Sequence, residues 1–170
     1  NIFMRYPINN TSQLIRYNIP KSSLIAIQNG RNCLIYLDSS GKETKFYERY
    51  ITGNHLKNRI KYHELRSLDC IRNVEDSTIS NLVVFSNKSL FIVDHRILIP
   101  RNKPHFNYVY IRNNPGISIS KLTEYMNFDT IIWDQSNKYW MVNDWTQECD
   151  SLHLPYFDIQ KKGAFIIKGS

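Results

Sequence analysis

The histidines, cysteines and carboxylates of this chain could perform catalysis or bind a metal, but their spacing points to neither. The five histidines are scattered, and none lies in the HxH or HExxH spacing that lets neighbouring imidazoles bind one ion. Asp94-His95, which follows a hydrophobic segment, is the local pair that most resembles a ligand site, although polar residues that end a strand explain it better. The sequence also contains no nucleophile motif and no glycine-rich phosphate loop.

The composition is that of an ordinary globular protein. Of the 170 residues, 42% are hydrophobic and 22% are charged, which excludes a disordered chain, and no apolar run is long enough for a transmembrane helix. Cys33, Cys70 and Cys149 are an odd number without a CxxC pair, so we expect free buried thiols. We expect one soluble domain over residues 1–170, cut from a longer protein because the chain opens with Asn1.

Basic residues outnumber acidic ones and are grouped. Lys and Arg total 22 against 15 Asp and Glu, a net charge of +7 that suits a polyanion. Residues 95–123 contain five of the positive charges, aromatic residues and no acid, and residues 42–66 contain seven positive charges against three acids. Cations with aromatics for stacking are typical of single-strand binding, although Tyr108 and Tyr110 could simply alternate on a strand. The candidate phosphate contacts are Arg96, Arg101, Lys103 and Arg112.

The first half of the chain reads as a meander of strands followed by a helix. Strand-length apolar runs cover residues 13–18, 23–28 and 32–37, and Asn29-Gly30 predicts a tight hairpin turn between the last two. Helix-like spacing covers residues 43–65, with a break expected at Gly53. Two further strands are predicted at 79–85 and 90–94.

The last third predicts alternating strands and helices. Ser118 is placed to cap a helix through Met126, and Val142, Trp145 and Cys149 share one face of a second helix. This β-α-β-α-β-β order favours a sheet with helices on a face. The predicted segments are strands at 106–111, 130–134, 155–159 and 164–168 and helices at 118–126 and 138–152.

Two stretches resemble a known family. Residues 17–27, Gly30-Arg31 and residues 34–38 look like the opening hairpin of the metallo-β-lactamase-like domain of ComEC-type competence proteins. A second set of residues is similar to the final helix, strand and Gly-Ala strand of that domain, especially in Bacteroidetes-like versions. The set consists of 134–137, Tyr139-Trp140, Trp145, Cys149, Leu152, 155–157 and 162–167. The resemblance implies a four-layer αββα sandwich of mixed α/β (α+β) class, possibly reduced. It also implies a membrane protein that passes one strand of transforming DNA across the bacterial inner membrane.

The zinc-dependent nuclease activity often proposed for the family does not carry over residue by residue. The HxHxDH loop would lie within residues 39–78, which contain only His55 and His63. The later His-His-Gly-Ser element falls on Asn113-Asn114-Pro115-Gly116, and Asp94 stands where the family places a bridging aspartate. One carboxylate cannot hold two zinc ions, so the resemblance implies a degenerate copy of the fold without metal, cofactor or catalysis.

We therefore expect a non-catalytic domain of a DNA-uptake membrane protein, on the extracytoplasmic side. Its expected partners are single-stranded DNA, the parent transmembrane domain and other competence proteins. One alternative is a remodelled metal-dependent hydrolase or nuclease around Asp94, His95 and His105. Another is a structural partner-binding module, which exposure of a tryptophan (Trp133, Trp140 or Trp145) would support.

Overall fold

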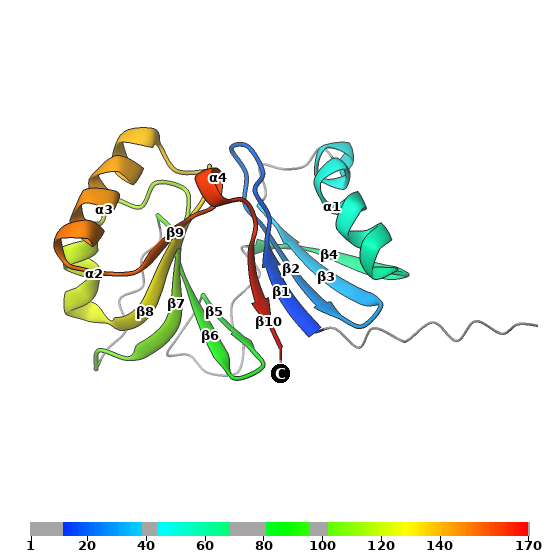
Figure 1. Cartoon of the computed structure of the whole chain (residues 1–170), viewed down its shortest axis with the longest axis horizontal. Helices are drawn as coiled ribbons and strands as arrows, with labels where there is room; N and C mark the ends of the chain where they lie inside the picture. Colours follow the sequence, from blue (N-terminus) through cyan, green and yellow to red (C-terminus); the bar gives the residue numbers. More distant parts are fainter. Residues whose placement is uncertain (1–11, 39–43, 69–80, 96–101, 170) are drawn as a thin grey trace, which may run out of the picture.

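Two five-stranded sheets form the centre of the protein. The computed structural model describes residues 12–38, 44–68, 81–95 and 102–169. The first sheet has the order β10-β1-β2-β3-β4, and the second has the order β5-β6-β7-β8-β9 (Figure 1). The strands of the first sheet are β1 (Ser12–Arg16), β2 (Leu24–Asn29), β3 (Asn32–Leu37), β4 (Tyr62–Ser67) and β10 (Phe165–Lys168). Those of the second are β5 (Leu82–Phe85), β6 (Lys88–Val93), β7 (His105–Ile111), β8 (Asn127–Trp133) and β9 (Tyr156–Asp158).

Helices cover the outer face of each sheet, which gives four layers (Figure 1). The helices are α1 (Thr44–Asn58), α2 (Ile119–Tyr125), α3 (Tyr139–Ser151) and the short α4 (Ile159–Lys162). One buried cluster joins α1 to the first sheet through residues such as Tyr47 and Ile35. Another joins α2 and α3 to the second sheet through Leu122, Trp133 and Trp145. The third lies between the sheets. The predicted mixed α/β fold with an αββα arrangement is confirmed.

Local signals in the sequence account for several element boundaries. The β2–β3 hairpin turn consists of Gly30 and Arg31, one residue later than the Asn29-Gly30 signal predicted, because Asn29 ends β2 and pairs with Asn32. Gly30 has φ +59°, a left-handed conformation that such a tight turn requires. The hydroxyl of Ser118 accepts a 3.2 Å hydrogen bond from the Lys121 backbone N–H and so caps α2 as expected. No helix among the described residues is long and apolar enough to cross a bilayer.

The predicted helical stretch over 43–65 is wrong in two respects. Helix α1 runs through Gly53 without a break, because Tyr47 and Ile51 are buried against the first sheet and hold it there. Residues Tyr62–Ser67 are strand β4, which pairs parallel with β3. Helix α1 and strand β4 both contain mixed polar and apolar residues, so the hydrophobic spacing did not distinguish the strand from the helix.

The end of the chain joins the two sheets. The predicted final pair of strands is present, but β9 extends the second sheet beside β8 whereas β10 pairs antiparallel with β1 in the first sheet. The chain changes sheets at α4, where Asp158 caps the helix by accepting from the Gln160 and Lys161 backbone N–H groups. Strand β10 therefore covers an edge of the first sheet that would otherwise be open.

Continuity of α1 through Gly53 predicts that G53A stabilises the protein. A Cβ at this position meets no atom within 4 Å, and alanine lowers the backbone entropy lost on folding, so unfolding should cost about 0.5–1 kcal/mol more. Urea unfolding followed by circular dichroism measures the change. G163A is the matched control, and it should destabilise because Gly163 has φ +83°. A destabilised G53A would contradict the continuous helix.

Candidate functional site

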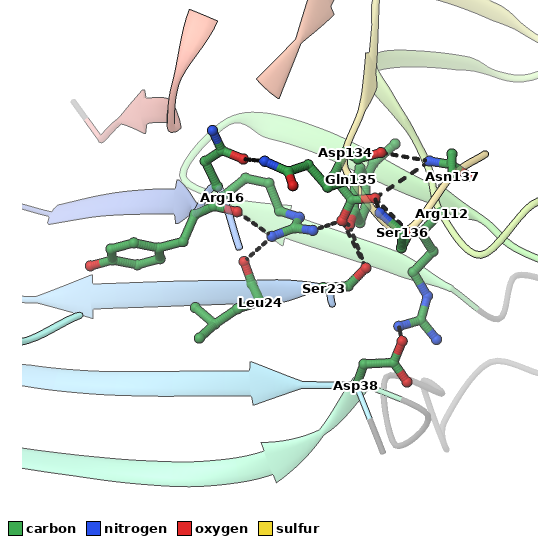
Figure 2. Close-up of polar contacts among 12 residues, drawn as sticks. Arg16, Ser23, Leu24, Asp38, Arg112, Asp134, Gln135, Ser136 and Asn137 are labelled. Atoms are coloured by element: carbon green, nitrogen blue, oxygen red, sulfur yellow. Dashed lines mark hydrogen bonds and ion pairs between the residues drawn. The ribbon is translucent and has the colours of Figure 1, made fainter. Parts of the chain in front are cut away.

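Charged side chains gather where the parallel strands of the second sheet end. Strands β6, β7 and β8 run parallel, so the residues that follow them, Asp94, Arg112 and Asp134, lie at one edge of the sheet. Residues of the first sheet approach the same edge (Figure 2). We call this group of buried residues the strand-end network; it consists of Arg16, Ser23, Asp38, Asp94, Tyr110, Arg112 and Asp134.

Asp134 is the centre of the network. Its Oδ2 pairs with the Arg16 guanidinium and accepts hydrogen bonds from the Ser23 hydroxyl at 2.8 Å and the Tyr110 hydroxyl at 2.6 Å. Its Oδ1 accepts from the Ser136 hydroxyl at 2.5 Å and the Ser136 backbone N–H at 3.1 Å. Arg16 and Ser23 belong to the first sheet whereas Tyr110 and Asp134 belong to the second, so this carboxylate ties the two sheets together.

Arg16 is oriented by backbone groups as well as by Asp134. Its Nη1 donates to the carbonyl oxygens of Tyr17 and Leu24, each at 2.7 Å, as Figure 2 shows. The side chain is 2% exposed, and its Cζ lies 4.7 Å from the centroid of the Tyr110 ring. Burial lowers the pKa of Arg16 and raises the pKa of Tyr110, so the tyrosine keeps the proton that it donates to Asp134.

Arg112 bridges the other two carboxylates of the network. Its Nη1 lies 3.7 Å from Oδ2 of Asp38, and its Nη2 lies 3.5 Å from Oδ2 of Asp94. Asp38 also accepts a 3.0 Å hydrogen bond from the Asn113 side-chain amide. All three charged side chains are at most 10% exposed, so one guanidinium holds two buried carboxylates that come from different sheets.

Asn113 and Asn114, which the sequence resemblance places opposite two family histidines, have structural partners here. Both have left-handed backbone conformations, with φ of +56° and +54°, which asparagine tolerates better than most residues. The Asn113 backbone N–H donates to the Ser136 hydroxyl at 2.9 Å, and the Asn114 backbone N–H donates to the Asn137 side-chain oxygen at 2.9 Å. These bonds connect the loop after β7 to the loop after β8.

The side chains of the network do not fit a dinuclear metal centre. Within the described ranges, no three His, Cys, Asp or Glu side chains are grouped closely enough to hold one ion. Asp134 is already saturated by donors, and Asp38 and Asp94 face the permanent positive charge of Arg112. A cation that approached these carboxylates would have to displace a buried guanidinium.

The topology keeps apart the residues of the alternative site, Asp94, His95 and His105. Asp94 and His95 follow the carboxyl end of β6, whereas His105 begins the parallel neighbour β7. Seven strand residues separate the two ends of β7 by about 20 Å. His105 is exposed, and its Nε2 lies 2.9 Å from Oδ1 of Asp129. The expected hydrolase arrangement is therefore not assembled.

The described cysteines are not activated nucleophiles. Burial raises the pKa of Cys33 to about 11 and that of Cys149 to about 12, so both are neutral thiols at physiological pH. Both are buried and free, as the sequence predicted. Cys70 lies outside the described residues.

Structure changes the list of candidate phosphate contacts. Arg112 is 2% exposed and paired with carboxylates, so burial argues against a role on phosphate. Lys103 is exposed at the amino end of β7, while Arg96 and Arg101 lie outside the described residues. Tyr110 is buried between the sheets and offers no face for stacking, and Tyr108 is half-buried with its ring at 71° to that of Phe165.

A second group of cations was only partly recognised from the sequence. Helix α1 ends beside the β2–β3 turn, because the Lys61 backbone N–H donates to the Arg31 carbonyl oxygen at 2.9 Å. This brings Arg31 next to the exposed basic residues at the end of α1. We call the group the α1–β4 corner; its exposed cations are Arg31, Lys57, Arg59 and Lys61. Segments 29–33 and 55–63, which form it, contain no acid.

Comparison with protein families gives one match. A family model described as the ComEC C-terminal domain matches residues 14–169, which is nearly the whole chain. Comparison with curated proteins and with solved structures gives no significant match. The match confirms the family resemblance seen in the sequence.

The network predicts that D134N severely destabilises the fold. The substitution leaves the buried Arg16 guanidinium without its counter-charge, so unfolding should cost about 3–5 kcal/mol less. Y110F removes the hydrogen bonds of the phenol with Asp134 and Ser23 but no charge, and it should cost about 1–2 kcal/mol. The control is E124Q, whose carboxylate pairs with Lys121 in an exposed position and contributes at most about 1 kcal/mol. Denaturant unfolding measures the free energy of unfolding of each variant. Equal losses for the three substitutions would contradict the central role of Asp134.

Proposed function

Since the chain belongs to the family of ComEC C-terminal domains, we propose that it acts in DNA uptake as a non-catalytic domain. It contacts single-stranded DNA through exposed cations and does not cut it. The proposal includes attachment to a membrane-embedded parent protein and contact with other competence proteins, on the extracytoplasmic side of the inner membrane.

One observation carries the non-catalytic part of the proposal. The carboxylates at the strand ends, where a hydrolase of this fold would bind its ions, are engaged by Arg16 and Arg112. Arginine remains protonated at any physiological pH, so these pairs persist. Such carboxylates can neither ligate an ion nor accept a proton from water, and the edge serves to hold the two sheets together.

Charge supports the DNA-binding part. The chain has a net charge of +7, and exposed cations occur at Lys103 and at the α1–β4 corner. Counterion release makes such cations effective on a single strand even without base recognition. Arg112 is not among these contacts, because its buried guanidinium is paired with Asp38 and Asp94.

Partner binding is a second candidate function, favoured by exposed aromatic residues at the start of α3. Tyr139 is 77% exposed and Trp140 is 60% exposed, whereas Trp133 and Trp145 are core residues. Lys138 places its Nζ 5.0 Å from the centroid of the Trp140 ring. Large exposed aromatics of this kind are enriched at protein interfaces.

Divalent metal should not alter the wild-type protein. We expect Zn²⁺ and Mn²⁺ to leave Tm unchanged and no hydrolysis of single-stranded DNA that a chelator abolishes, because Arg112 already neutralises Asp38 and Asp94. R112A should lower Tm and recover part of the loss when Mn²⁺ is added, whereas R112K, which keeps a cation, should respond less. Stoichiometric metal in the purified wild-type protein would support the hydrolase alternative instead.

Binding to single-stranded DNA should weaken steadily with salt. We expect log K to fall linearly with log salt concentration, with a slope of about 0.7 per phosphate neutralised. Fluorescence anisotropy of a labelled oligonucleotide between low and physiological salt measures the slope. K103A should reduce its magnitude, and K168A, an exposed cation on β10, is the control. Absence of binding at low salt would leave the partner-binding function as the better explanation.

A further inference from the structure

A pocket lies on the outer side of the first sheet, away from the strand-end network. It has a volume of about 450 Å³ and lies between α1 and β4. Ile51, Leu56 and Ile60 form its apolar part, and Glu48, Thr52 and Arg59 contribute polar groups. His55 from α1 and His63 from β4 complete the wall. The size and the mixed lining suit a flat heterocyclic ring with polar edges.

The two histidines present aromatic faces and hydrogen-bonding edges. Their ring centroids are 5.7 Å apart with an interplanar angle of 43°. The Nε2 atom of His55 is buried and has no hydrogen-bond partner among the described residues. Burial, and secondarily the neighbouring His63, lowers the pKa of His55, so the ring is a neutral imidazole at physiological pH. A polar ligand atom would satisfy this nitrogen, which otherwise costs stability.

The positively charged α1–β4 corner adjoins this pocket. Arg59, which lines the pocket, follows the last residue of α1, and Lys61 lies two residues before the pocket residue His63. The backbone bond from Lys61 holds Arg31 beside them. An apolar pocket with cations beside it matches a nucleotide, with its ring inside and its phosphates outside.

We propose that this pocket binds an unstacked base of single-stranded DNA, with the adjoining phosphate held by Lys61. The inference rests on the proposed function and adds the site where a base is held. The Glu48 carboxylate accepts a hydrogen bond from an exocyclic amino group, as acidic side chains do with cytosine N4. The imidazoles contact the ring face.

A metal ion fits the pocket less well than a base does. Only two imidazoles approach each other, and the described residues contain no group of three ligands for an ion. The surrounding cations would also repel a metal ion, whereas they attract a phosphodiester. Charge and lining therefore favour the nucleotide.

The test compares two probes that carry the same phosphates. One is a labelled oligodeoxycytidine, and the other is an abasic oligonucleotide of equal length. Electrostatic contact alone binds both equally, whereas a base pocket favours the oligodeoxycytidine about tenfold, because stacking and base contacts are added. Equal affinity of the wild-type protein for both probes would overturn the pocket and leave the proposed DNA contact standing. Absence of binding to either probe would overturn both.

Substitutions in and around the pocket test whether the preference for bases arises there. H63A, at an exposed position, and T52W, which fills the pocket, should abolish the preference for bases while the salt slope stays unchanged, because neither removes a cation. K61A should weaken both probes and reduce the magnitude of the salt slope by about 0.7. K168A, on the opposite edge strand of the first sheet, is the control for surface charge. A base preference that survives both H63A and T52W places the base elsewhere and refutes the proposal.

Discussion

The ion pair between Arg16 and Asp134 constrains how the two halves of this protein meet. Both side chains are almost fully buried, and a charge taken out of water is tolerated only when partners replace its hydration. Arg16 comes from the first sheet and Asp134 from the second, so a displacement of one sheet against the other would leave two unpaired charges inside the protein. Tyr110 and Ser23 strengthen the same restriction from both sides.

Arg112 links the two sheets in the same way as Arg16, at the same strand ends. A hydrolase of this architecture holds its strand-end carboxylates around exchangeable ions, and here a covalently attached cation lies between Asp38 and Asp94. A guanidinium cannot dissociate, polarise a water molecule as a metal does, or open a coordination position. On the proposed function, this end of the sheets is therefore part of the core, and contact with DNA is left to the outer surfaces.

The sequence predicted the parts of the fold that depend on local chemistry. Gly30 determines a turn and Ser118 a helix start, and both signals act within a few residues. The network was not predicted, because Ser23 and Asp134 are 111 residues apart and no local pattern links them. Arg112 was taken for a surface cation since charge spacing alone does not reveal burial. The α1–β4 corner was missed as a unit because Arg31 joins it only through tertiary contact.

Burial of the arginines does not weaken the argument for a polyanionic partner. Arg16 and Arg112 lie inside the protein, but Asp38, Asp94 and Asp134 are buried with them. Among the described residues, the interior therefore takes more negative than positive charges away from the surface. The attraction for phosphates is thus left to the surface cations, and Arg59 and Lys61 of the α1–β4 corner lie beside a pocket.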